Sequence, residues 1–318
     1  MFGRTWRVGR IAGVAIRIDA SWTIIFALVT WSLYEWLGDL YPRLGTGPAL
    51  ALAAAASLLF FGSVLTHEMA HAVVARRRGI PVHGITLFLF GGATHAAVEA
   101  KGPGAEFTVA AVGPLTSLGL GAAFGLGGMF GDGILPEEVA GTLGYLGIVN
   151  VSLAVFNLIP GFPLDGGRVL RSIVWRATGS IDRATRVAAI AGQTVGYLLM
   201  AAGLLFVATG LRTTGIWFAA IGWFLAQAAR TSYAQQQLQS RLGSATAAEV
   251  MSSAEDLVAG DSDLVVPRDA PMTEVLGKLE TGKTRRVLVA AQGDEIVGLI
   301  GPADIARWLR REDAVEAG

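Results

Sequence analysis

Two histidines and a glutamate lie within five residues of one another inside an apolar stretch of this 318-residue chain. They form the pattern H-E-x-x-H, made by His67, Glu68 and His71. Residues four apart share one face of a helix, so both imidazoles can bind the same metal ion. Glu68 is placed to take a proton from water that such an ion polarises. The pattern therefore predicts the zinc site of a hydrolase.

A catalytic zinc site needs a third protein ligand and keeps a fourth position open. The longer pattern with a downstream Gly and His is excluded, because the chain has Val74 and Arg77 at those positions. The remaining candidates for the third ligand are His95, Glu99, Glu106 and Asp165. Asp165 stands out by context, because an apolar stretch runs into a Pro/Gly-rich break that ends in its carboxylate.

The composition predicts that a membrane surrounds these residues. Hydrophobic residues make up 53% of the chain and charged residues 16%, and there is no cysteine. Six stretches are apolar and long enough to form spans of about 20 residues: Ala20–Leu37, Pro48–Thr66, Phe107–Phe130, Val139–Pro160, Val187–Gly210 and Thr213–Ala229. Six such runs exceed what a soluble core can bury. We expect an α-helical polytopic membrane protein with about six transmembrane helices, and not a disordered chain, a disulfide scaffold or a nucleic-acid binder.

Basic residues predict the orientation of these spans. They concentrate in residues 4–17, 76–101 and 168–186, whereas the opposite loops carry only Arg43 and Arg212. By the positive-inside rule both termini are then cytoplasmic, in a multi-pass protein of the cell membrane without a secretory signal. The two histidines and Asp165 lie at the same depth in this topology, so they can meet.

A second motif closes the fourth apolar stretch: Asn157, Pro160, Asp165 and Gly166 form N-x-x-P-x-x-x-x-D-G. Together with H-E-x-x-H, this motif resembles the site-2 protease family of intramembrane zinc metalloproteases. The resemblance covers approximately residues 1–230.

This resemblance implies a function for each motif residue. It implies that His67, His71 and Asp165 bind one zinc ion and that Glu68 is the general base. It also implies that Asn157 lies near the reaction centre; a hydrogen bond between spans is the alternative role for this residue. The implied substrate is a single-pass membrane protein, cut in or beside its transmembrane segment.

Two further segments are similar to parts of that family. In one, Ser117 stands after Gly113-Pro114 at a position where the family usually has Asn. This segment can therefore still pack against other helices, but it cannot perform a role that needs a side-chain amide at that position. The other, residues 84–92, is short, aromatic and bounded by glycines, and it predicts a strand or hairpin. The resemblance implies that it holds the substrate as an added strand; a re-entrant packing loop is the alternative.

The end of the chain differs in composition from the rest. Residues 1–244 carry 17 basic and 11 acidic side chains, whereas residues 245–318 carry 8 and 14. The pattern predicts helices at 271–279 and 302–309, strands at 286–290 and 295–300, and a turn at 292–294. It resembles a CBS domain, so we expect a membrane-embedded metalloprotease domain over 1–240 and a small soluble α/β, cytoplasmic, CBS-like regulatory domain over 245–318.

Two properties follow from the resemblance of this domain. CBS domains work in pairs, so a single copy implies a homodimer. The nucleotide-binding motif of CBS domains is only partly present, because Gly301 stands where Thr or Ser is usual, three residues before Asp304. Binding of an adenosine nucleotide is therefore supported only in part.

Two other functions fit parts of this sequence. Six spans with such a tail also describe a transporter or channel gated by a CBS domain, although a transporter does not need H-E-x-x-H. A catalytically silent membrane chaperone that keeps the fold is the other alternative. The favoured function is an intramembrane zinc endopeptidase.

Overall fold

The structure is a computed structural model that describes residues 5–88, 91–96, 102–131, 133–253, 264–272, 275, 287–290 and 296–316. Two compact units make up the chain, Met1–Ser232 and Tyr233–Gly318. The division falls inside the last long helix of the first unit. The boundary expected from the sequence, where the net charge of the chain changes from basic to acidic, lies further along. It coincides with the C-terminal end of that helix, at Ser244.

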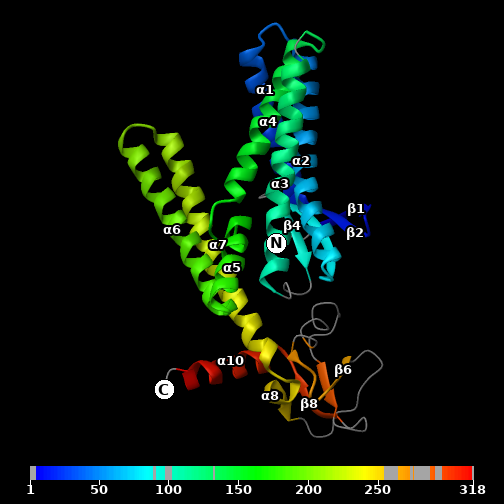
Figure 1. The fold of residues 1–318 in the computed structure, drawn as a ribbon, viewed down its shortest axis with the longest axis vertical. Helices are drawn as coiled ribbons and strands as arrows, with labels where there is room; N and C mark the ends of the chain where they lie inside the picture. The colour runs from blue at the N-terminus through cyan, green and yellow to red at the C-terminus, as the bar shows by residue number, and fades with distance from the viewer. Residues whose placement is uncertain are drawn as a thin grey trace. The chain divides into compact units, whose positions relative to one another are not determined.

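Seven helices begin within the first unit, and the last of them continues into the second (Figure 1). They are α1 (Ala20–Leu40), α2 (Thr46–Arg77), α3 (Pro103–Gly131), α4 (Glu137–Asn157), α5 (Asp165–Thr178), α6 (Ile181–Ala208) and α7 (Arg212–Ser244). Each of the six apolar stretches lies in a helix for all or most of its length, and two of them, Val139–Pro160 and Val187–Gly210, extend past the ends of α4 and α6. Of these, α2, α3, α4 and α6 are long and apolar enough to cross a membrane. Helices α1 and α7 fall outside that set, so the count of six spans stays a prediction.

Small residues line the contacts between these helices. The buried face of α2 carries Ala49, Ala53 and Ala56, whereas Leu50 and Leu58 are exposed. A Cβ added to Gly128 of α3 would stand 2.8 Å from the carbonyl oxygen of Ala140 in α4. Small residues facing other helices and large apolar ones facing outward are the pattern expected in lipid, where close backbone packing stabilises the bundle.

A four-stranded sheet lies against the helices, in the order β1 (Thr5–Ile11), β2 (Val14–Asp19), β3 (Val82–Phe88) and β4 (Gly91–Ala96). Strands β3 and β4 form an antiparallel hairpin, as the sequence predicted for residues 84–92. Strand β2 pairs with β3 in parallel, and the hairpin of β1 and β2 is a feature that the sequence did not predict. Arg76 at the end of α2 donates a hydrogen bond to the carbonyl of Ala12, which attaches the turn of that first hairpin to α2.

The second unit contains α8 (Ala247–Val250), α10 (Pro302–Glu316) and a sheet ordered β5 (Ser252–Ser253), β8 (Ile296–Ile300), β7 (Val287–Ala290), β6 (Leu264–Pro267). Strands β6 and β7 are parallel, and the other pairs are antiparallel. The two predicted strands are confirmed as β7 and β8, and the predicted final helix is longer than expected. The predicted turn at 292–294 and most of the predicted helix at 271–279 lie outside the described residues.

Candidate metal centre

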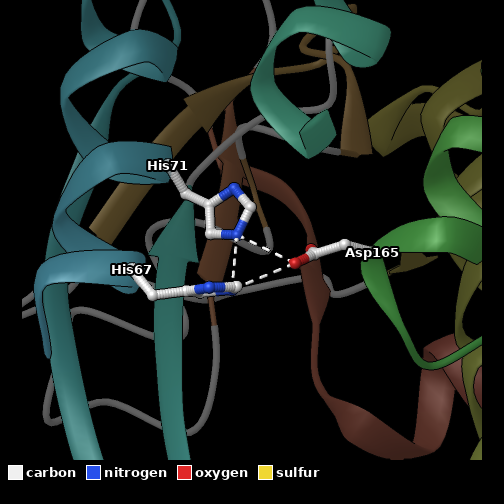
Figure 2. Close-up of side chains that lie close together, drawn as sticks. All are labelled: His67, His71 and Asp165. Carbon is white, nitrogen blue, oxygen red and sulfur yellow. Dashed lines mark hydrogen bonds and ion pairs between the residues drawn. The ribbon is translucent and has the colours of Figure 1, made fainter. Parts of the chain in front are cut away.

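His67 and His71 lie one turn apart on the same buried face of α2 (Figure 2). Their Nε2 atoms are 3.1 Å apart. This arrangement follows directly from the four-residue spacing, because the side chains at i and i+4 stack along a helix. The H-E-x-x-H pattern therefore gives the paired imidazoles that the sequence predicted.

Asp165, the first residue of α5, completes the group. Its Oδ2 atom lies 3.1 Å from Nε2 of His67 and 3.1 Å from Nε2 of His71. The three ligand atoms lie within 4.8 Å of one another, and Figure 2 shows the side chains pointing toward one another from two helices. Two imidazoles and one carboxylate match the three protein ligands of a catalytic zinc site.

The outer nitrogens of the imidazoles also have partners. Nδ1 of His71 donates to the carbonyl of Val109 over 2.6 Å, which leaves Nε2 as an acceptor. For Nε2 of His67 to bind a metal, its Nδ1 must donate to Oγ of Ser117, which lies 2.9 Å away. Such partners set the tautomer and the ring orientation of metal-binding histidines. When Nε2 of His71 is unprotonated, its lone pair faces a carboxylate oxygen, and a cation between the two atoms would make this arrangement favourable. The residues present therefore fit a bound metal ion.

Helix α3 passes so close to the two imidazoles that only glycine fits at the contact. A Cβ on Gly113 would lie 2.7 Å from Nε2 of His67 and closer still to Nε2 of His71. The packing role that the sequence analysis kept for the Gly113-Pro114 segment is thus confirmed. The contact of Ser117 with His67 is not among the features predicted from the sequence. A signal was present, because Val109, Gly113 and Ser117 follow one another at intervals of four and share one helical face.

Glycines also shape the loop that delivers Asp165. Helix α4 ends at Asn157, and α5 begins after a break that coincides with the predicted Pro/Gly-rich segment. A Cβ on Gly166 would overlap the carbonyl oxygen of Ile159, and one on Gly167 would lie 2.6 Å from the carbonyl oxygen of Gly161. The first turn of α5 is therefore packed tightly onto the loop before it, and this packing places Asp165.

Glu68 lies beside strand β4. Its side chain is partly exposed, and a Cβ on Gly92 would stand 3.0 Å from its Cδ and closer to its Cγ. The backbone of β4 therefore runs close to the carboxylate that neighbours the two candidate metal-binding histidines. A glycine at position 92 leaves the room for this approach.

The other candidates for the third ligand have different environments. Glu106 is fully buried and forms an ion pair with Arg171, whose Nε lies 2.6 Å from Oε1 of Glu106. His95 belongs to β4, but its side chain, like Glu99, lies outside the described residues. Asn157 donates its Nδ2 hydrogen to the carbonyl of Leu153 in its own helix over 3.0 Å. Its role near the reaction centre therefore stays a prediction.

A multi-pass helical protein that gathers two histidines and an aspartate between its helices has the construction of a membrane-embedded metallohydrolase. Residues 55–134 and 132–203 match the model of Peptidase family M50. The protein sll0528 of Synechocystis sp., named as a zinc metalloprotease, is 38% identical over 301 residues, covering 94% of this chain and 76% of that protein. The chain belongs to peptidase family M50, the site-2 protease family, and it is a metallopeptidase.

Two other similar proteins extend the comparison. Rip3 of Mycobacterium tuberculosis, also named as a zinc metalloprotease, is 45% identical over 239 residues. The match covers 73% of this chain and spans 60% of the length of Rip3. The solved site-2 protease from Methanocaldococcus jannaschii is 26% identical, with a TM-score of 0.49, covering 72% of this chain and 95% of that one. Family membership favours the protease over the transporter alternative.

Proposed function

We propose that this protein is an intramembrane zinc endopeptidase that cuts a single-pass membrane protein in or beside its transmembrane segment. The observation that carries the proposal is the convergence of His67, His71 and Asp165 beside Glu68, within a bundle of membrane-length helices. A peptide bond in a membrane helix is shielded by its own hydrogen bonds and by the absence of water. A protease there must supply water, a metal site and an unwound substrate.

The division of labour among the residues follows from their positions. Zinc, when bound, supplies Lewis-acid polarisation of water and of the scissile carbonyl. Glu68 takes the proton from the attacking water and passes it to the leaving amide nitrogen. Val109 and Ser117 keep the two imidazoles in the required tautomer. Asn157 at the end of α4 stabilises the oxyanion or the substrate backbone, as the family motif implies.

Strand β4 is the place where the unwound substrate binds. Among the described strands it is one of the two edges of its sheet, with β3 on one side only. An edge strand offers backbone donors and acceptors to an extended peptide. Because the backbone at Gly92 packs on Glu68, a peptide added along β4 has its backbone near the proposed base.

The orientation proposed for the enzyme places both termini in the cytoplasm. This rests on the bias of arginines toward one side of the spans. The end of α2 illustrates it, since Arg76, Arg77 and Arg78 are all exposed there. The metal centre, just before this end of α2, then opens toward the cytoplasmic side.

Residues 245–318 are proposed to be a CBS-like module that pairs two chains. The strand order, with β6 and β7 parallel and β7 and β8 antiparallel, supports this. The carboxylate of Asp304 is engaged by Ser252, by the backbone N–H of Gly301 at 2.9 Å and by Arg307 at 3.1 Å. Pairing rather than nucleotide binding is therefore the proposed role. We expect a dimer when the mass of the full-length protein is measured in detergent, and a monomer would contradict this role.

The proposed reaction is tested with the purified protein in liposomes that contain single-pass model substrates. We expect cuts inside the membrane segment, loss of cutting after removal of metal by a chelator, and recovery when zinc is added back. The cut sites are located by mass spectrometry of the products. Cutting that persists in metal-free protein, or a zinc-loaded protein that cuts none of a broad substrate panel, contradicts the proposal.

A further inference from the structure

A buried ion pair joins α3 to α5, away from the proposed metal ligands. Glu106, in the first turn of α3, is 0% exposed. Nε of Arg171 donates to Oε1 of Glu106 over 2.6 Å, and Nη2 of the same guanidinium contacts the same oxygen. Nε of Arg168 lies 3.9 Å from that oxygen, and its side chain is 36% exposed. Charged side chains are almost never buried this completely unless they are paired.

On α3, Glu106 belongs to the face that holds the histidines. Val109 follows it after one turn and accepts the hydrogen bond of His71. Gly113, in contact with both imidazoles, is seven residues beyond Glu106. At 1.5 Å per residue this separation is about 10 Å along the helix. The carboxylate of Glu106 is thus in line with the metal site but too far away to be a ligand.

On α5, the partner of Glu106 lies at a matching distance from the third ligand. Arg171 is six residues beyond Asp165, or about 9 Å along the helix. The two helices therefore pass each other in opposite directions, with the metal group at one end of their contact and the ion pair at the other. The guanidinium of Arg171 also lies over the ring of Phe162, 5.4 Å from its centre, in the loop that leads to Asp165.

We infer that Glu106 and Arg171 are a positioning pair that holds the carboxylate of Asp165 beside Nε2 of both histidines, where it would bind a metal ion. This inference rests on the proposed metalloprotease function. The two histidines come from one helix and are set by local geometry, but Asp165 comes from a different helix and must be held there by contacts between helices. Two nitrogens of one planar guanidinium converge on a single carboxylate oxygen, and these charge-assisted contacts restrict both the distance and the orientation of the two side chains. The same guanidinium packs on Phe162, so the pair acts on α5 and on the loop before it.

The test compares Glu106→Gln and Arg171→Lys with the wild type and with Glu137→Gln, which changes an exposed glutamate at the start of α4. Glutamine keeps the shape of Glu106 without its charge. Lysine keeps the charge of Arg171, which favours folding, but loses the planar fork. We measure zinc affinity by chelator competition and the visible absorption spectrum of the cobalt-substituted protein, which reports ligand geometry. Thermal unfolding is recorded in parallel.

We expect both variants to bind zinc about tenfold more weakly, the low end of the loss seen when groups behind a metal ligand are removed. We also expect an altered cobalt spectrum, while Glu137→Gln behaves as wild type. If either variant fails to fold, the other decides. Wild-type affinity and spectrum in the folded variants overturn the inference, even when the unfolding temperature falls, because the pair then only stabilises the fold. A wild type that binds no metal overturns the proposed function together with this inference.

Discussion

Replacing Glu68 by glutamine is expected to lower the rate of substrate cleavage about a thousandfold, within the range that a general base contributes. Glutamine has nearly the same size and keeps the contact with Gly92, but it cannot accept the proton from water. Zinc content is expected to stay at the wild-type level, because the three proposed ligands are untouched. The measurement is the single-turnover rate on a model substrate in liposomes, together with metal analysis of the same sample.

The matched control for this variant is Glu35→Gln, which removes an exposed carboxylate from α1. Its cleavage rate should equal that of the wild type. If Glu68→Gln keeps more than about one tenth of the wild-type rate, a loss smaller than general bases give, Glu68 is not the base. If it loses zinc as well as activity, its role lies in holding the site.

Replacing Asp165 by asparagine is expected to remove the metal. Groups behind a ligand are worth about 10–100-fold in affinity, so loss of a ligand itself should cost more than about a hundredfold. Asparagine keeps the shape of the side chain and the tight packing around Gly166, but it lacks the negative charge that faces Nε2 of both histidines. We expect zinc to be lost during purification and cleavage to be absent, as measured by metal analysis and the liposome assay.

Asp182→Asn is the control, since Asp182 is an exposed residue in the first turn of α6. It should retain one zinc ion per chain and full activity. Retention of one tightly bound zinc ion by Asp165→Asn would contradict the assignment of the third ligand. His95 or Glu99 would then be the candidate for the third ligand, because Glu106 is already paired with Arg171.

Some features of this protein follow from its sequence because they depend on residues close together in the chain. The pairing of His67 with His71 needs only a helix, since the four-residue spacing places both on one face. The break between α4 and α5 follows from its Pro and Gly residues, which do not continue a helix. The β3–β4 hairpin and strands β7 and β8 of the second unit likewise follow from local patterns.

Other features were decided only when distant segments packed together. Local sequence left four candidates for the third ligand, and the packing of α3 and α5 brings Asp165 to the histidines while it pairs Glu106 with Arg171. The hairpin of β1 and β2 acquires its place by pairing with β3, more than 60 residues later. The contact of Ser117 with His67 likewise joins two helices. Periodicity specifies the face on which a side chain lies. The neighbour that this face meets depends on shape and charge over the whole bundle, and only the tertiary structure decides it.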